Sequence, residues 1–305
     1  LYVKGAAEVL MERCSGVLDA SGEVVSCDAQ SFRQAVDDMA SRGLRVLAFA
    51  RKKLSGTDQI TMADVDNLTL LGLQGMIDPT RPEAIEAVRT CHQAGITVKM
   101  ITGDHALTAA AIGKQIGLCG QGCEGVITGA ELAKLTDSEL IEKVQSVNVF
   151  ARVAPEQKIR LVEALQSLGH VVAMTGDGIN DAPALKQADI GIAMGITGTD
   201  VSKAAADMVL LDDNFASIEA AIEEGRGVYD NLTKFISWAL PTNLGEGLVL
   251  LAAIIAGVTL PILPIQILYI NMITAIMLGT SLSLEPKEPG LMLRKPRDPK
   301  EPILN

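Results

Sequence analysis

The stretch VVAMTGDGIND, residues 171–181, decides the fold of this chain. It opens with a short apolar run, Val171–Met174, which is typical of a buried parallel strand. A glycine-rich loop follows and carries two carboxylates, Asp177 and Asp181, with an asparagine between them. Ligands of open α/β sheets bind at the carboxyl ends of strands, and Mg²⁺ takes oxygen ligands that it often shares with phosphate. The loop therefore predicts a Mg²⁺ and phosphate site, unless Asp181 only caps the helix that comes next.

A second unit with the same pattern lies earlier in the chain. The apolar run Ile96–Ile101 leads into Thr102-Gly103-Asp104. Each unit follows a segment that begins at a proline and stops at a glycine, residues 82–94 and 155–168, as helices commonly do. The repeat predicts an alternating β/α fold in which both loops lie at one edge of the sheet.

Hydropathy separates this soluble part from an apolar part. Mean hydropathy is +0.29, and the segment 235–284 holds 50 residues with one formal charge, Glu246. That length allows two membrane helices of about 20 residues each. The breakers in GVTLPILP, residues 257–264, predict the turn between them. The net charge of −11 and the aromatic content of 3% argue against a nucleic-acid partner.

Basic residues flank the apolar pair on both sides. Arg226 and Lys234 precede it, and five lysines and arginines follow between residues 287 and 300. Positive charge at both ends predicts that both face the cytoplasm, together with the α/β part. One long helix, residues 216–238, is expected to run from the soluble part into the membrane, either as a mechanical connection or as a plain tether.

Polar residues inside the apolar segments predict a cation site. A carboxylate such as Glu246 is costly in hydrocarbon and is a functional candidate by default. Asn243 lies three residues earlier on the same helix face, and Pro241 is expected to weaken the helix and free carbonyl ligands. The second segment offers Asn271 and Thr274, again three residues apart. The alternative is a protonated glutamic acid that is hydrogen-bonded within a helix bundle.

Over essentially its whole length the chain resembles the C-terminal half of the catalytic unit of type II P-type ATPases, the group that includes calcium pumps. The resemblance rests on KGAAE at 4–8, DPTR at 78–81, MITGD at 100–104, FAR at 150–152 with Lys158, and TGDGINDAPAL at 175–185. The family has KGAPE, DPPR and TGDGVNDAPAL at the corresponding places. The four polar membrane residues, Asn243, Glu246, Asn271 and Thr274, fall where calcium pumps keep ion ligands.

This resemblance implies roles for the matching residues. Thr102 and Gly103 would hold the transferred phosphoryl group, and Lys158 would neutralise its charge. The residues implied in binding ATP are Lys4, Gly5, Arg45, Asp104 and Arg152. The residues implied in the Mg²⁺ site are Asp177 as ligand, with Asn180 and Asp181 ordering the loop. Without the resemblance, Lys158 reads as a solvated helix position and Arg45 as a strand-edge charge.

Two departures from the family pattern bear on function. The family is phosphorylated on the aspartate of a DKTGT motif, which is absent here and is expected to lie N-terminal to Leu1. We therefore expect a fragment that alone forms no phosphoenzyme and transports nothing. The second departure is Ala275, which stands where calcium pumps carry an aspartate after the residue matching Thr274. Ca²⁺ is the first expectation. Because calcium affinity depends on ligand charge, the missing carboxylate leaves Mn²⁺, Na⁺, K⁺ or a proton as alternatives.

Three classes of function remain open. The first is an ATP-driven cation pump, most simply for Ca²⁺ export across a bacterial plasma membrane. The second is a soluble phosphatase of the haloacid dehalogenase-like superfamily, and the third is a truncated partner that binds nucleotide without catalysis. The expected domains are residues 1–68 (end of an α+β nucleotide-binding domain), 69–229 (a Rossmann-like α/β phosphorylation domain of the haloacid dehalogenase-like type), 230–284 (transmembrane helical hairpin) and 285–305 (cytoplasmic loop).

Overall fold

The computed structural model describes residues 1–26, 28–54, 60–77, 79–118 and 125–303. The chain divides into two compact units. One comprises Leu1–Val88 and Val98–Asp213, and the other comprises Arg89–Thr97 and Asn214–Asn305. Asp78, in the predicted hinge segment, lies outside the described residues.

The N-terminal part of the first unit is a five-stranded sheet in the order β1-β4-β5-β2-β3. Its strands are β1 (Tyr2–Ala6), β2 (Cys14–Leu18), β3 (Val24–Val25), β4 (Arg45–Arg51) and β5 (Leu68–Met76), and its helices are α1 (Ala7–Met11), α2 (Ala29–Ser41) and η1 (Met62–Asp64). Alternate residues of β4 and β5, among them Ala48, Ala50, Leu68 and Leu70, form its core with Val36 of α2. Since β5 begins at Leu68, this sheet continues past the expected boundary.

The part that follows alternates strands and helices, as the repeated pattern predicts. It lies in the first unit except for the end of its first helix, from Arg89 on, which groups with the second unit. The strands are β6 (Met100–Thr102), β7 (Val126–Thr128), β8 (Val149–Ala151), β9 (Ala173–Gly176), β10 (Ile190–Met194) and β11 (Met208–Leu210). The helices are α3 (Pro82–Gln93), α4 (Ala106–Gln115), α5 (Gly129–Leu132), α6 (Asp137–Ser146), α7 (Pro155–Ser167), η2 (Ile179–Asp181), α8 (Ala182–Gln187) and α9 (Asp200–Ala205). The two predicted helices, α3 and α7, are confirmed within a residue at each end.

The expectation of one sheet is wrong for the described strands. They form two parallel sheets, in the orders β6-β8-β7 and β11-β10-β9. The two strands that lead into the candidate loops, β6 and β9, are both edge strands, and no described strand pairs with both. Side chains connect them instead, because Ile101 of β6 packs with Met174 of β9 and Val162 of α7. The first strand is also shorter than expected, since residues 96–99 have no ladder partner.

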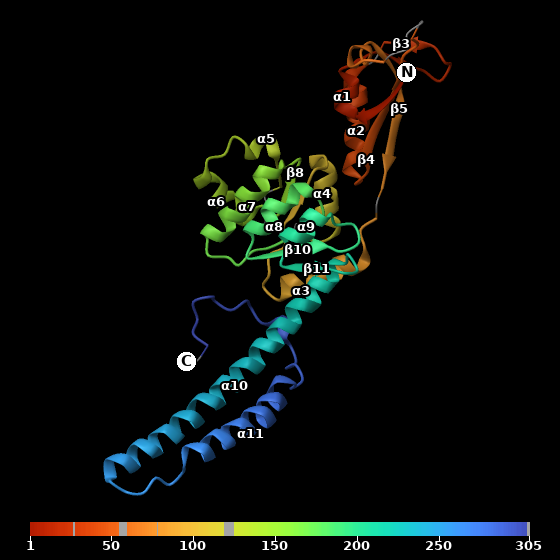
Figure 1. Cartoon of the computed structure of the whole chain (residues 1–305). Coiled ribbons are helices and arrows are strands. Elements are labelled where there is room, and N and C mark those ends of the chain that lie inside the picture. The colour runs from red at the N-terminus through yellow and green to blue at the C-terminus, as the bar shows by residue number, and fades with distance from the viewer. Residues whose placement is uncertain (27, 55–59, 78, 119–124, 304–305) are drawn as a thin grey trace. The chain divides into compact units, whose positions relative to one another are not determined.

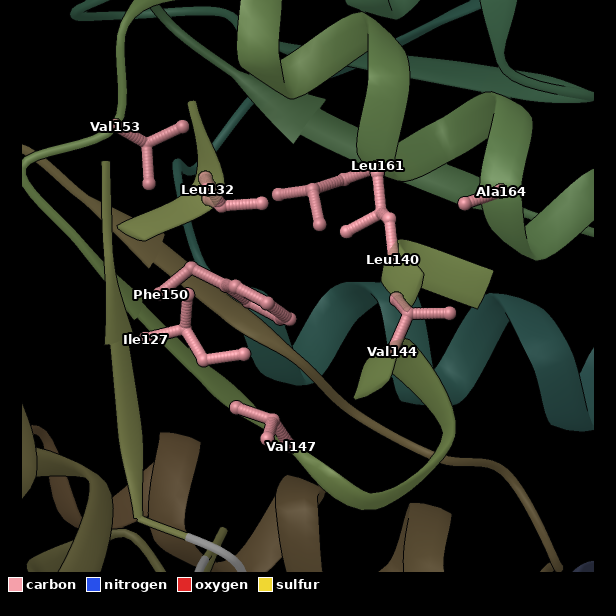
Figure 2. Packing of buried hydrophobic residues seen from close by; sticks show 9 residues of the cluster. All are labelled: Ile127, Leu132, Leu140, Val144, Val147, Phe150, Val153, Leu161 and Ala164. Carbon is pink, nitrogen blue, oxygen red and sulfur yellow. The ribbon is translucent and has the colours of Figure 1, made fainter. Parts of the chain in front are cut away.

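One apolar cluster fixes the strand and the helix that carry two candidate residues. Figure 2 shows Phe150 of β8 facing Leu132, Leu140 and Leu161 from three surrounding helices. Phe150 is 1% exposed, and burying such a side chain contributes about 1.5–3 kcal/mol. Because β8 and α7 are anchored here, the positions of Arg152 and Lys158 at their ends are set by packing.

The second unit is built on a pair of antiparallel helices (Figure 1), α10 (Phe215–Ala256) and α11 (Pro264–Ser283), followed by η3 (Leu291–Leu293). Both helices are long and apolar enough to cross a membrane by length and composition. Gly257 ends α10 in the left-handed conformation, with φ at 65°, so the predicted break is confirmed. Helix α10 is continuous through Pro241, so the helix does not break there. The proline weakens it only by lacking the backbone N–H that would complete one helical hydrogen bond.

The segment after α11 is held along α10 by charged and polar contacts. Arg226 donates hydrogen bonds to the carbonyl oxygens of Leu291, Arg294 and Ala94 at 2.7, 2.9 and 3.0 Å. Lys234 and Lys287 each pair with two glutamates of the other segment, at N–O distances of 2.7–3.1 Å. Within the second unit, Arg226 therefore ties together three segments that lie far apart in sequence.

Candidate active site

A buried ion pair lies at the end of β9. Lys158 Nζ of α7 lies 2.5 Å from Asp181 Oδ1, and the two side chains are 18% and 10% exposed. The other carboxylate oxygen of Asp181 accepts the backbone N–H of Gly178 at 3.1 Å. Asp181 is the N-cap residue of α8, but its side chain makes no capping bond to that helix. The sequence alternatives of a mere α8 cap and a solvated lysine are therefore both wrong.

Glycine makes room for this carboxylate. A Cβ atom on Gly176 would lie 2.5 Å from Asp181 Cβ and 2.8 Å from its Cγ. Real Cβ atoms do not approach so closely, so any side chain at this position displaces Asp181 or the strand. The first glycine of TGDG is thus required for the Lys158–Asp181 pair.

Asp177 of the same loop is exposed, whereas Asp181 is buried. Within the described residues the Asp177 carboxylate has no hydrogen bond or ion pair. Its backbone carbonyl accepts the Thr199 N–H at 2.9 Å, and the Ser202 hydroxyl oxygen lies 3.0 Å from it and 2.8 Å from the Thr199 carbonyl oxygen. Asn180 is likewise exposed. A free carboxylate on a fixed backbone, near a lysine, fits a hard divalent cation shared with a phosphoryl group.

The second predicted loop is an ordered turn at the end of β6. Thr102 Oγ1 accepts the backbone N–H of Asp104 at 3.1 Å and lies 3.2 Å from Asp104 Oδ2. Gly103 is exposed and has open space where a Cβ would be. Thr102 pairs in register with Ala151 of β8, so the turn and Arg152 leave neighbouring strands side by side.

The residues implied in nucleotide binding form two ion pairs. Arg152 has φ at 52°, and its guanidinium lies 2.9 Å from Glu8 Oε1. Partial burial acts against the shift, but a backbone hydrogen bond and the charge of Arg152 hold the pKa of Glu8 below its ordinary value. Arg45 Nε lies 4.0 Å from Asp104 Oδ1 and is 71% exposed. Lys4 is exposed on β1, where Gly5 pairs with Ala48, and the structure does not join either to these pairs.

The candidate ion ligands lie on the paired helices but form no closed cage. Glu246, Asn271 and Thr274 are half-buried, whereas Asn243 is exposed. Thr274 Oγ1 donates to the carbonyl of Ile270 at 2.8 Å, which leaves its lone pairs available. No cluster of three or more His, Cys, Asp or Glu side chains that could hold a metal occurs among the described residues.

Sequence reasoning missed four residues of the site region: Glu8, His105, Ser202 and Asp213. Glu8 is the last residue of KGAAE and His105 follows MITGD, and their side chains lie 3.4 Å apart. Their places inside or beside quoted motifs were an available signal. Ser202 and Asp213 lie outside those motifs. Only the fold brings Ser202 to the Asp177 carbonyl and Asp213 to the turn at residues 195–197.

Comparison with known proteins places the chain in a family. The family description "haloacid dehalogenase-like hydrolase" matches residues 8–189, and "Cation transporting ATPase, C-terminus" matches residues 259–305. The chain belongs to the haloacid dehalogenase-like hydrolase family, and its C-terminal residues match the family described as the C-terminus of cation-transporting ATPases. The Rossmann-like expectation and the family resemblance are thereby confirmed, and the chain is part of an enzyme family.

Three relatives illustrate the match. The chain is 58% identical over 309 residues to "Probable cation-transporting ATPase F" of Mycobacterium tuberculosis. It is 53% identical to "Cation-transporting ATPase pma1" of Synechocystis over 306 residues and 46% identical to "Calcium-transporting ATPase" of Bacillus subtilis over 306 residues. These alignments cover 99–100% of the chain but only 34% of each relative. The chain therefore spans about a third of the length of the curated relatives it matches.

Proposed function

We propose that this chain supplies the Mg²⁺ and phosphate chemistry, and part of the ion path, of an ATP-driven cation pump that works through an aspartyl-phosphate intermediate. The observation that carries the proposal is the arrangement after β9. Lys158 and Asp181 form a buried pair, and the Asp177 carboxylate stands free beside it. Phosphoryl transfer needs positioning and charge neutralisation more than covalent help from the protein, and this loop offers both.

Within this proposal the residues divide the work. Asp177 binds Mg²⁺, which offsets charge on the phosphoryl oxygens, and Asn180 and Asp181 order its loop. Thr102 Oγ1 and the N–H of Gly103 hold the phosphoryl group, while Lys158 approaches it from α7. The residues that bind ATP are Lys4, Gly5, Arg45, Asp104 and Arg152. Glu8 releases Arg152 to the nucleotide when ATP enters.

The two open sheet edges support a site for the phosphorylated aspartate. Parallel sheets are normally covered and continuous, and unpaired edges invite another strand. The edge strands β6 and β9 share packing through Ile101 and Met174. We propose that the strand ending in DKTGT comes from the part of the longer protein outside this chain and pairs between them. This chain alone then forms no aspartyl phosphate.

Transport is assigned to the paired helices of the second unit. We propose a cation site at Asn243, Glu246, Asn271 and Thr274, in a multi-pass protein of the bacterial plasma membrane with the α/β domains cytoplasmic. Ca²⁺ is the first candidate, supported by the printed name of the Bacillus subtilis relative. Because Ala275 removes a carboxylate, Mn²⁺, Na⁺ and K⁺ remain candidates.

The proposal favours four domains. They are the end of a nucleotide-binding domain (1–68), a phosphorylation domain (69–229), the membrane hairpin (230–284) and a cytoplasmic loop (285–305). Because β5 continues the first sheet, the first boundary moves to Met76. A soluble phosphatase would have no use for two exposed apolar helices. A non-catalytic partner is the remaining competitor, and a reading frame lacking DKTGT would favour it.

The test is phosphoenzyme formation from radiolabelled ATP in the complete reading frame that contains this chain. We expect an acid-stable, hydroxylamine-sensitive phosphoprotein that requires Mg²⁺ and is lost in Asp177→Ala. Glu163→Gln, an exposed position on α7, is the matched control and keeps the signal. Phosphorylation that is unchanged in Asp177→Ala would contradict the assignment of the site.

A further inference from the structure

The carboxylate of Asp213 accepts hydrogen bonds from the turn at residues 195–197. Its Oδ1 accepts the N–H groups of Gly195 and Ile196 at 2.7 and 3.0 Å. Its Oδ2 accepts both the N–H and the hydroxyl of Thr197 at 2.7 Å. One carboxylate therefore fixes three consecutive residues of the loop that follows β10. Hydrogen bonds to an ionised acceptor are about twice as strong as neutral ones, so these contacts constrain the loop strongly. The Gly195 N–H also lies 2.8 Å from the Leu210 carbonyl oxygen.

The backbone of Asp213 is itself held in place. The Arg81 guanidinium donates to the Asp213 carbonyl at 3.1 Å, and Asp213 adopts φ at 51°, an uncommon conformation for a residue other than glycine. The Ile196 N–H and the other donors of the turn lower the pKa of Asp213 to about 2. The carboxylate therefore stays ionised at any pH at which the protein works.

The far end of the same loop holds the main chain of Asp177. Thr199 donates its N–H to the Asp177 carbonyl at 2.9 Å, and Ser202 Oγ lies 3.0 Å from that oxygen. Ser202 is fully buried, at 0% exposed. Gly198, between the two ends, packs on the carbonyl of Met194, where a Cβ would lie 1.9 Å away. Segment 195–202, which is the loop after β10 and the first residues of α9, thus connects Asp213 to the main chain of Asp177 through hydrogen bonds at both ends.

We propose that Asp213 and Ser202 are positioning residues for the Mg²⁺ site, and that segment 195–202 sets the backbone from which the Asp177 carboxylate reaches the metal. The inference rests on the proposed role of Asp177 as ligand. Ordering a flexible loop costs conformational entropy, and the fold meets that cost before the metal arrives. A loop that must be ordered by the metal binds it more weakly.

The test is direct metal binding to the complete protein, with Mn²⁺ as an EPR-visible probe and no nucleotide present. The Glu246→Gln background removes the proposed transport site, and the binding lost in Asp177→Ala defines the loop site. We expect Asp213→Asn and Ser202→Ala each to raise the Mn²⁺ dissociation constant of that site by about three- to tenfold, the range for one or two lost hydrogen bonds. Nucleotide affinity measured without metal should not change.

The matched control is Asp19→Asn. Asp19 Oδ1 also accepts two backbone N–H groups and a serine hydroxyl, at 2.6–2.9 Å, in the turn after β2. Its substitution should leave Mn²⁺ binding unchanged. Wild-type Mn²⁺ affinity in Ser202→Ala would overturn the inference, even where Asp213→Asn fails to fold. An equal loss in Asp19→Asn would also overturn it. Unchanged binding in Asp177→Ala would instead overturn the metal assignment itself, so the two failures are distinguishable.

Discussion

Lys158 and Asp181 illustrate how far single residues could be predicted. Their motif marked them as site residues, but from the sequence alone a lysine on a helix reads as solvent-exposed. Burial of the pair depends on where α7 meets the loop after β9, which no local pattern shows. The same holds for Asp213 and Glu8, whose partners are 16 or more residues away in sequence. Residue types and motifs were predictable, whereas their pairing was not.

The buried pair predicts a strongly non-additive stability effect. Lys158→Met leaves the Asp181 carboxylate buried without its partner, which should cost about 3–5 kcal/mol. Asp181→Leu should cost a similar amount. The double variant should be less destabilised than the sum of the two, since no unpaired charge remains. Thermal unfolding of the complete protein in detergent measures all three, and additive effects would mean that the two charges do not interact.

Asp213 predicts a pH dependence with a definite sign. The pKa of its carboxyl is lowered from the ordinary value of 3.8 to about 2, chiefly by the Ile196 N–H. A lowered pKa stabilises the fold above the ordinary value, and that contribution is lost as the pH falls through about 2. Asp213→Asn should therefore unfold more readily than wild type at pH 7, and the difference should shrink between pH 4 and 2. Unfolding midpoints across that range check it, and a difference that grows on acidification would contradict it.

At the scale of elements, helices were predicted better than strands. Prolines at the start and glycines after the end located α3 and α7, and Gly257 located the end of α10. Such signals are local, because a helix satisfies its own backbone hydrogen bonds. A strand needs a partner that is distant in sequence. For that reason residues 96–99 were wrongly predicted as strand, and the single sheet was not found among the described residues.

Arg226 predicts that three segments of the second unit depend on one side chain. Arg226→Ala leaves the carbonyls of Ala94, Leu291 and Arg294 without their donor, at about 1–3 kcal/mol for each group that water does not reach. Arg226→Lys retains the positive charge but lacks the planar guanidinium whose several N–H groups reach these carbonyls. Both variants should make the segment after η3 more sensitive to proteolysis, and the effect of Arg226→Ala should be the larger. Arg33→Ala changes an exposed position on α2 and is the control, which should be cleaved like wild type. Equal cleavage of wild type and Arg226→Ala would contradict the prediction.

At the scale of the whole molecule, the chain combines the proposed Mg²⁺ and phosphate site with an apolar helix pair in 305 residues. Composition alone separated these parts, because one segment of 50 residues carries a single charge. The division seen in the structure differs from the predicted one, since Arg89–Thr97 groups with the helices rather than with the α/β part. This grouping arises from long-range contacts such as Arg226 with Ala94, which a linear pattern does not reveal.

The central claim is that the site after β9 and the polar residues of the helix pair serve one cation-dependent reaction. The most direct measurement is ATP hydrolysis by the complete protein at fixed Mg²⁺, with Ca²⁺, Mn²⁺, Na⁺ and K⁺ each titrated. Wild type, Glu246→Gln, Ala275→Asp and the control Glu163→Gln are compared. We expect one cation, with Ca²⁺ as the first candidate, to stimulate ATP hydrolysis by the wild type. The stimulation should be lost in Glu246→Gln and kept in Glu163→Gln. Ala275→Asp should show a higher apparent Ca²⁺ affinity. Hydrolysis that responds to none of the cations, or a response that Glu246→Gln leaves intact, would contradict the account.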